Sequence, residues 1–179
     1  MTGAICLLEK DKASVIQIGR DGNPAFAGAM LYSKYQTEEK VRSLMELGDL
    51  IELHEIISPT RYSDHYIEKR KGKAKKACLQ PNVCVFADRD VFDENEKNHE
   101  AREYTPNVKL VYICEGVDFL YVFNVKSGKW STYAIDAFFE GEFRQLKIDY
   151  PFYVKNLLDR NDITVLSSIE RTRLENFMK

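Results

Sequence analysis

The sequence lacks the short motifs that identify common catalytic and nucleotide-binding sites. It has no Gly-x-Ser-x-Gly nucleophile turn, and its glycine-containing turn at residues 19–24 lacks the Gly-Lys-Ser/Thr ending of a P-loop. The three histidines, His54, His65 and His99, are dispersed rather than spaced as zinc ligands. These absences predict no catalytic residue, no metal site and no cofactor.

Cysteine is also scarce, and long apolar runs are missing. The four cysteines, Cys6, Cys78, Cys84 and Cys114, form no Cys-x-x-Cys pair, so we expect buried free thiols and a reducing compartment. No apolar run approaches the roughly 20 residues that cross a bilayer, and the opening residues lack a signal-peptide pattern. We therefore expect a cytoplasmic protein with no membrane partner.

What the sequence has in quantity is aromatic and charged residues. Ten tyrosines and ten phenylalanines contribute to an aromatic content of 12%, which favours strands and large buried surfaces. The length of 179 residues fits a single domain. A net charge of −2 argues against a surface that binds nucleic acid throughout, but it allows a local basic patch.

The first third of the chain has clear element boundaries. Two apolar runs, Ala4 to Leu8 and Ser14 to Ile18, predict a β-hairpin. Apolar residues between Ala25 and Tyr35 have helical spacing, and a clearer helix follows with Thr37 as its N-cap and Gly48 as its stop. The next residues, Asp49 to Leu53, are compatible with a strand or a short helical turn.

The later chain predicts further strands and helices. We expect a strand at Val83 to Phe86 and a helix within Glu94 to Arg102. An antiparallel meander, with Trp130 packed on the sheet, is then predicted from the runs Lys109 to Cys114, Asp118 to Val125 and Trp130 to Ile135. Helices are expected at Tyr153 to Leu158 and from Ser167 or Ser168 to Met178. Strands and helices without βαβ alternation predict one α+β domain, residues 1–179, with an N-terminal hairpin, a central helix, a meander and a C-terminal helix.

A charged, exposed excursion is expected at about residues 59–80. It contains a basic run: Lys69, Arg70, Lys71, Lys73, Lys75 and Lys76. Such a run can contact nucleic-acid phosphates, and Tyr62 and Tyr66 upstream could stack on bases. The alternative interpretation is a solvated loop.

The stretch from Asp88 to Glu103 is mostly acidic, and we expect it to be exposed. If the preceding strand continued, Asp88 and Asp90 would point the same way and could hold Mg²⁺ for a phosphodiesterase. The alternative is a solvated acidic loop.

Several segments together resemble a family of small, uncharacterised α+β proteins found mostly in bacteriophages and mobile elements. The shared pieces include Asp21-Gly22-Asn23-Pro24, followed by Gly28 and Leu31, then Leu47-Gly48-Asp49-Leu50, Arg89-Asp90 and the aromatic strand before Trp130. Together they cover roughly residues 4–135. The chain departs from the family at Ile18-Gly19-Arg20, where members often carry a Cys-His element. The resemblance implies an accessory role in the cytoplasm of a bacterial host cell.

These observations favour binding over catalysis. We expect a non-catalytic binding protein that engages a host protein or sequesters a small phosphorylated ligand. Candidate ligand contacts are Arg20, Lys34, Arg89 and Asp90, if their side chains converge. A nucleic-acid-binding protein that uses the basic run and a Mg²⁺-dependent phosphodiesterase are the alternatives.

Overall fold

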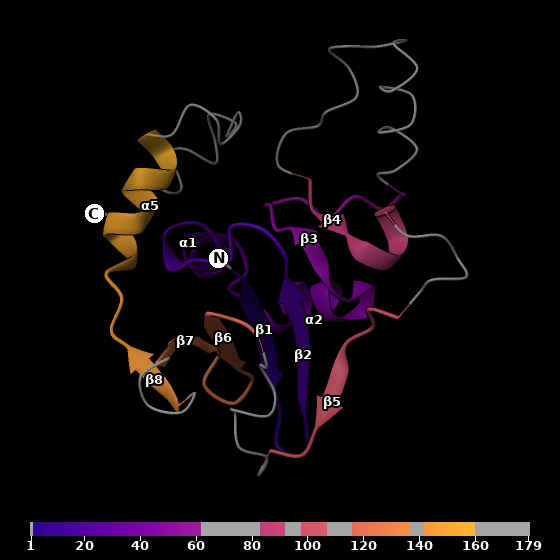
Figure 1. Cartoon of the computed structure of the whole chain (residues 1–179), viewed down its shortest axis with the longest axis horizontal. Coiled ribbons are helices and arrows are strands. Elements are labelled where there is room, and N and C mark those ends of the chain that lie inside the picture. Colours follow the sequence, from indigo (N-terminus) through magenta and orange to yellow (C-terminus); the bar gives the residue numbers. More distant parts are fainter. Residues whose placement is uncertain (1, 62–82, 92–97, 107–115, 137–141, 160–179) are drawn as a thin grey trace.

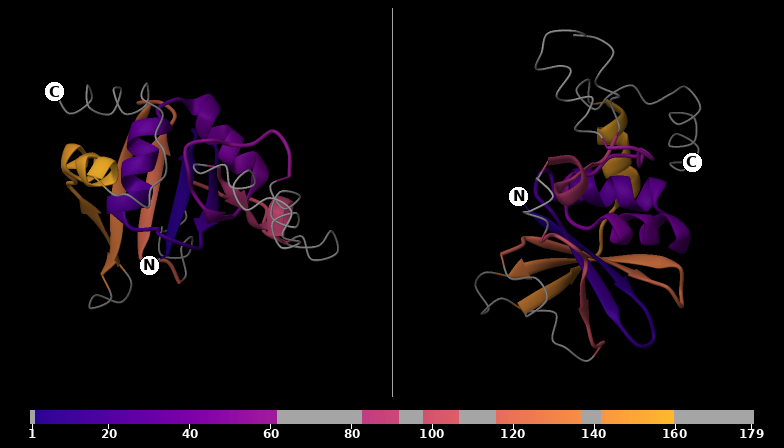
Figure 2. Two further views of the ribbon diagram at one scale, coloured as in Figure 1. Left: turned by 90° about the horizontal axis from the view of Figure 1, so that it is seen from above. Right: turned by 90° about the vertical axis from the view of Figure 1, so that its right-hand side faces the viewer.

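The computed structural model describes residues 2–61, 83–91, 98–106, 116–136 and 142–159, and the structural statements below concern these residues. Their strands form one mixed sheet, and the helices gather on one of its faces (Figures 1 and 2). The predicted α+β class is therefore confirmed. The predicted strand at Lys109 to Cys114 and the last predicted helix lie outside the described residues.

The centre of the sheet is the predicted hairpin. Strands β1 (Gly3–Leu8) and β2 (Ala13–Ile18) pair antiparallel along their full lengths. On its other side β1 pairs in parallel with β6 (Phe119–Asn124). This parallel pairing across more than a hundred residues has no local signal in the sequence.

The meander extends the sheet beyond β6. Strand β7 (Lys129–Asp136) pairs antiparallel with β6, and β8 (Glu142–Leu146) pairs antiparallel with β7. The first two strands were predicted, whereas β8 was not. Trp130 packs against the core as expected. Its indole nitrogen also donates to the Tyr35 carbonyl at 2.8 Å.

Strand β2 changes partner along its outer edge. Residues 13–15 pair with β5 (Arg102–Tyr104), and Ile18 pairs with β3 (Leu50–Glu52). Between these two partners the backbone N–H of Gln17 donates to Asp49 Oδ1 at 2.7 Å. The carboxylate thus satisfies a ladder position that neither neighbouring strand reaches.

Asp49 also joins three further segments. Its carboxylate accepts a hydrogen bond from Arg102 of β5 at 2.9 Å, and its N–H donates to the His99 carbonyl at 2.8 Å. Its carbonyl accepts from Ala87 N at 2.9 Å, directly after β4 (Val85–Phe86). The predicted helix at Glu94 to Arg102 is wrong where the chain is described, because residues 98–101 are irregular and Arg102 begins β5.

The described residues include five helical segments. They are the π-helical turn η1 (Pro24–Gly28), α1 (Ala29–Lys34), α2 (Glu38–Leu47), the π-helical turn η2 (Ala87–Val91) and α5 (Tyr150–Asp159). The predicted caps of α2 are confirmed: Thr37 Oγ1 accepts from Lys40 N, and Gly48 ends the helix at φ 81°. Helix α5 begins three residues before its predicted start, with Pro151 in the first turn, where a missing N–H costs nothing.

Apolar side chains are buried on both faces of the central strands, since neighbours alternate between two clusters. Ile5, Leu7, Ile16 and Ile18 face the helices, together with Leu44 of α2. The opposite cluster consists of Ala4, Cys6, Ala13, Val15, Val117, Leu120 and Val122. Burial on both faces explains why these strands read as continuous apolar runs rather than alternating ones.

We expect Gly48→Ala to destabilise the fold strongly. An added Cβ would lie 2.3 Å from the His99 carbonyl oxygen, and φ 81° already disfavours any residue with a side chain. The expected cost is about 3 kcal/mol or more in urea unfolding. Gly128→Ala is the matched control, because Gly128 also has positive φ but no atom within 4 Å of the new Cβ. Equal costs for both variants would contradict the close packing at Gly48.

Candidate functional site

Unusual structural features converge on residues 52–58, which begin at the last residue of β3 and which we call the rim segment. The π-helical turn η1 contacts it through Phe26, whose ring packs edge-on against His54 with centroids 6.0 Å apart. The π-helical turn η2 contacts it through Arg89, which donates to the Ser58 carbonyl at 2.5 Å. π-Helices are rare in proteins, and those that occur are often found at functional sites. Two of them contact this one short segment, so we take the segment as the candidate site.

The three predicted ligand-binding cations also reach this segment. Arg20 Nη1 lies 3.0 Å from Glu52 Oε1, and Lys34 Nζ lies 2.8 Å from Glu55 Oε1. With Arg89 on Ser58, three cations from distant parts of the chain each bind a different acceptor on the rim segment. Their contacts are spread along the rim segment and do not converge on one acceptor, as contacts to a single small ligand would.

The three cations differ sharply in their availability. The side chain of Arg20 is 69% exposed, whereas that of Lys34 is 7% exposed and that of Arg89 is 17% exposed. The Lys34–Glu55 pair thus fixes α1 to the rim segment from inside. Of the three, Arg20 presents its charge to solvent.

Arg89 and Asp90 together form a structural tie. The guanidinium donates to both carboxylate oxygens of Asp90, at 3.0 and 3.2 Å, and lies over the Phe86 ring. The Asp90 side chain is fully buried and accepts the Phe86 N–H at 2.8 Å, which satisfies a buried backbone donor at the end of β4. These contacts hold η2 against the sheet and account for both residues without a ligand.

The preceding strand does not continue to the two aspartates, so the condition for them to point the same way is not met. Strand β4 ends at Phe86, and Ala87–Val91 then forms η2, so Asp88 and Asp90 are not alternate residues of a strand. Asp88 instead accepts from the His99 backbone at 3.0 Å and lies 2.9 Å from His99 Nδ1. Burial disfavours the charged form of Asp88, but the His99 bonds outweigh it and lower the pKa of this carboxyl.

The described part of the chain contains no group of three or more metal-ligating side chains. The expected exposure of Asp88 to Glu103 is also wrong at Asp90, which packs inward. The acidic stretch is therefore partly a packing element, because its carboxylates satisfy backbone N–H groups.

A buried polar cluster supports the rim segment from beneath. The Tyr35 hydroxyl donates to the His54 carbonyl at 2.5 Å, and the Cys84 thiol donates to the same carbonyl at 3.1 Å. Burial raises the pKa of Cys84 to about 11, against the smaller effect of its hydrogen bonds. Such a thiol is protonated at neutral pH and is a poor nucleophile.

The other described cysteine behaves in the same way. Cys6 is completely buried on the second face of the sheet, and burial raises its pKa to about 12. Both residues are free thiols, as predicted. Cys78 and Cys114 lie outside the described residues.

Glu52 links Arg20 to His54. Its second oxygen lies 3.3 Å from His54 Nε2, and this hydrogen bond lowers the pKa of Glu52 despite burial, with a smaller contribution from Arg20. His54 Nδ1 is buried and finds no hydrogen-bond partner within the described ranges. Glu52 therefore connects an exposed arginine to a partly buried histidine.

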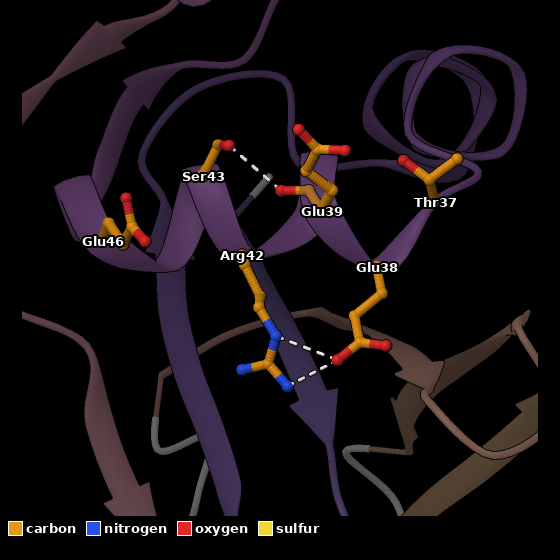
Figure 3. A pocket seen from close by; sticks show the side chains of 6 residues that line it. All are labelled: Thr37, Glu38, Glu39, Arg42, Ser43 and Glu46. Carbon is orange, nitrogen blue, oxygen red and sulfur yellow. Dashed lines mark hydrogen bonds and ion pairs between the residues drawn. The ribbon is translucent and has the colours of Figure 1, made fainter.

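An open depression beside α2 is the alternative location. It is lined by Thr37, Glu38, Glu39, Arg42, Ser43 and Glu46 (Figure 3). Arg42 binds Glu38 at 2.6 and 2.9 Å and also Glu9, while Ser43 donates to the Glu39 carbonyl. Arg42 is thus taken up by ion pairs, and Ser43 bonds the backbone of its own helix, so the depression offers less than the rim segment.

Sequence analysis did not identify the groups that accept hydrogen bonds from the three cations. Glu52, Glu55 and the Ser58 carbonyl bind cations that lie 21 to 32 positions away in the sequence. No local pattern indicates such partners. The predicted nucleic-acid contacts at residues 69–76 lie outside the described residues.

No helix in the described segments combines the length and apolar character needed to cross a membrane. Comparisons with protein-family models, curated proteins and solved structures find no match.

We expect Lys34→Met to destabilise the protein by about 3–5 kcal/mol, because it leaves the Glu55 carboxylate buried without its ammonium partner. The double variant Lys34→Met/Glu55→Leu should be more stable than Lys34→Met alone. Lys12→Met is the control, since it breaks an exposed ion pair with Glu103 and should cause no measurable change. Urea unfolding of the four proteins measures these differences, and a similar loss for both lysine variants would refute the buried-pair argument.

Acid should weaken the contribution of Glu52. Its lowered pKa means that the folded state favours the charged form, so the stabilisation is complete above the ordinary value of 4.5 and is lost as pH falls through the folded value. The stability difference between wild type and Glu52→Gln should therefore shrink as pH falls from 7 to below about 4. Urea midpoints across this range test it, with the exposed Glu46→Gln as control. A difference that is independent of pH would contradict the network.

Proposed function

We propose that this protein is a non-catalytic binding protein whose recognition surface is the rim segment with its flanking turns. Internal ion pairs and hydrogen bonds fix this backbone, while apolar side chains remain outside. Ile56 on the rim segment is 43% exposed, and Val91 at the end of η2 is 54% exposed. Large exposed apolar residues beside an arginine are typical of protein interfaces.

The exposed apolar residues are the observation that carries this proposal. Within the described residues, three large hydrophobic side chains are exposed, and two of them, Ile56 and Val91, belong to this surface. Arg89 ties η2 directly to Ser58, so both residues stand on one fixed framework. Exposing them costs solubility without improving the core, which a binding role explains.

The chemistry of the site supports binding rather than turnover. The thiol beneath the rim segment is buried and has a raised pKa, and the carboxylates of Asp88 and Asp90 are occupied by protein donors. A two-carboxylate Mg²⁺ site for phosphodiester hydrolysis receives no support from this arrangement.

The occupant that we favour is a protein. Sequestration of a small phosphorylated ligand by Arg20, Lys34 and Arg89 would require the last two to leave buried internal acceptors. A protein partner requires no such rearrangement. Together with the resemblance to bacteriophage and mobile-element proteins, this suggests an accessory factor that engages a protein of a bacterial host cell in its cytoplasm.

Nucleic-acid binding through the basic run is the second candidate. The described residues on either side of the excursion belong to the same surface, since Val83 bridges Ile56 and Cys84 N donates to the Ile56 carbonyl at 2.8 Å. Val83 and Cys84, the first described residues after the excursion, therefore lie on the proposed recognition surface. Its six cations would make such binding strongly dependent on salt.

Affinity capture from a lysate of bacterial host cells tests the proposal. Wild-type protein should enrich a protein that Ile56→Asp/Val91→Asp loses at least tenfold, because the new carboxylates cannot be desolvated in an apolar contact. Phe152→Asp is the matched control, since Phe152 is the third exposed large hydrophobic residue and lies on α5, away from the rim segment (Figure 1). Equal capture by all three proteins would rule out this surface.

The same lysate distinguishes the second candidate. Nucleic acid that copurifies, dissociates with salt and is lost in Lys73→Glu/Lys75→Glu/Lys76→Glu would replace protein binding as the function.

A further inference from the structure

The turn between β2 and η1, residues 19–23, is fixed at both ends. Gly19 N donates to the Leu50 carbonyl at 2.8 Å, and Arg20 N donates to the Ile51 carbonyl at 3.1 Å. At the far end the Tyr121 hydroxyl donates to the Gly22 carbonyl at 2.8 Å, and Asn23 Oδ1 accepts from Phe26 N. The turn therefore has little freedom to rearrange.

Steric contact restricts the same turn further. Gly22 lies so close to β1 that an added Cβ would be 2.3 Å from Gly3 N. Asp21, immediately before it, has φ 51°, the left-handed conformation that few non-glycine residues adopt. The backbone of Arg20 and Asp21 is thus held between fixed neighbours, and both side chains are exposed to solvent.

Arg20 has an open hydrogen-bonding edge. Its Nη1 binds Glu52, and its Nε and Nη2 meet no acceptor in the described part of the protein. Glu52 is in turn held by His54, so the guanidinium is oriented with its other edge available. An arginine fork of this kind fits a carboxylate or a phosphate with two parallel hydrogen bonds.

Asp21, the next residue in the chain, supplies the opposite charge. Its side chain is exposed, and no hydrogen bond or ion pair joins its carboxylate to a described residue. Since Glu52 is paired with Arg20, the turn carries both signs of charge, which disfavours a polyanion such as nucleic acid. The turn is also exposed rather than recessed, whereas small-molecule sites are concave. Both observations favour the surface of another protein.

We propose that this turn is a preorganised docking element for a protein partner that offers a carboxylate to Arg20 and a lysine or arginine to Asp21. The inference rests on the proposed binding function and specifies the charge pattern of its partner. Because the backbone of the turn is already fixed, binding does not have to order it, and the complex does not lose affinity to that entropic cost.

The test uses the protein captured by wild type, purified and titrated against variants by calorimetry. Arg20→Glu should weaken binding by about tenfold to a thousandfold, because it reverses the charge at a paired position. Arg20→Lys should weaken it less, since it keeps the charge but loses the fork. Lys129→Glu is the control, because Lys129 is an exposed cation at the start of β7 and should leave affinity unchanged.

Reciprocal charge reversal makes the assignment specific. Among charge reversals of the partner's exposed carboxylates, one Glu→Lys or Asp→Lys change should restore binding to Arg20→Glu. Equal affinities for wild type, Arg20→Glu and Lys129→Glu would overturn the inference.

The two proposals fail in different ways. Capture that Ile56→Asp/Val91→Asp abolishes but Arg20→Glu leaves intact would keep the binding function and remove the docking turn. Absence of any captured protein would remove both. Urea unfolding of Arg20→Glu checks that the fold is intact, which we expect because the Arg20–Glu52 pair is largely exposed.

Discussion

The arrangement around the rim segment depends on Asp49. A carboxylate directly after the glycine that ends α2 takes the Gln17 N–H where β2 passes from β5 to β3, and it pairs with Arg102 of β5. Its backbone groups bind His99 and Ala87. One residue therefore sets where the rim segment begins and where η2 starts, because each of these segments would otherwise bury an unsatisfied polar group.

Around this junction, buried ion pairs fix the backbone, and other side chains are exposed on it. Lys34 with Glu55 and Arg89 with Asp90 are buried pairs that define positions, since a buried charge without its partner is costly. Arg20, Ile56 and Val91 are exposed on the framework that these pairs hold. A fixed backbone with exposed arginine and apolar side chains is a sound basis for recognition, because little conformational entropy remains to be lost.

Much of the local structure could be predicted because its causes are local. The hairpin, the Thr37 cap, the Gly48 stop and the strand before Trp130 each follow from residues within one element. The predictions that were wrong concern charged residues. Asp88 and Asp90 have the composition of an exposed loop, yet one binds His99 and the other caps Phe86, because their donors come from elsewhere in the fold.

The α+β class and both ends of α2 could be predicted from sequence patterns, and Arg20, Lys34, Arg89 and Asp90 could be named as candidates. Which of the three cations is exposed could not be predicted, because exposure depends on acceptors that folding brings from 21 to 32 positions away. Spacing in the sequence reports the period of one helix or strand. It does not report which segments meet, and the distinction between a structural ion pair and a ligand contact depends on that.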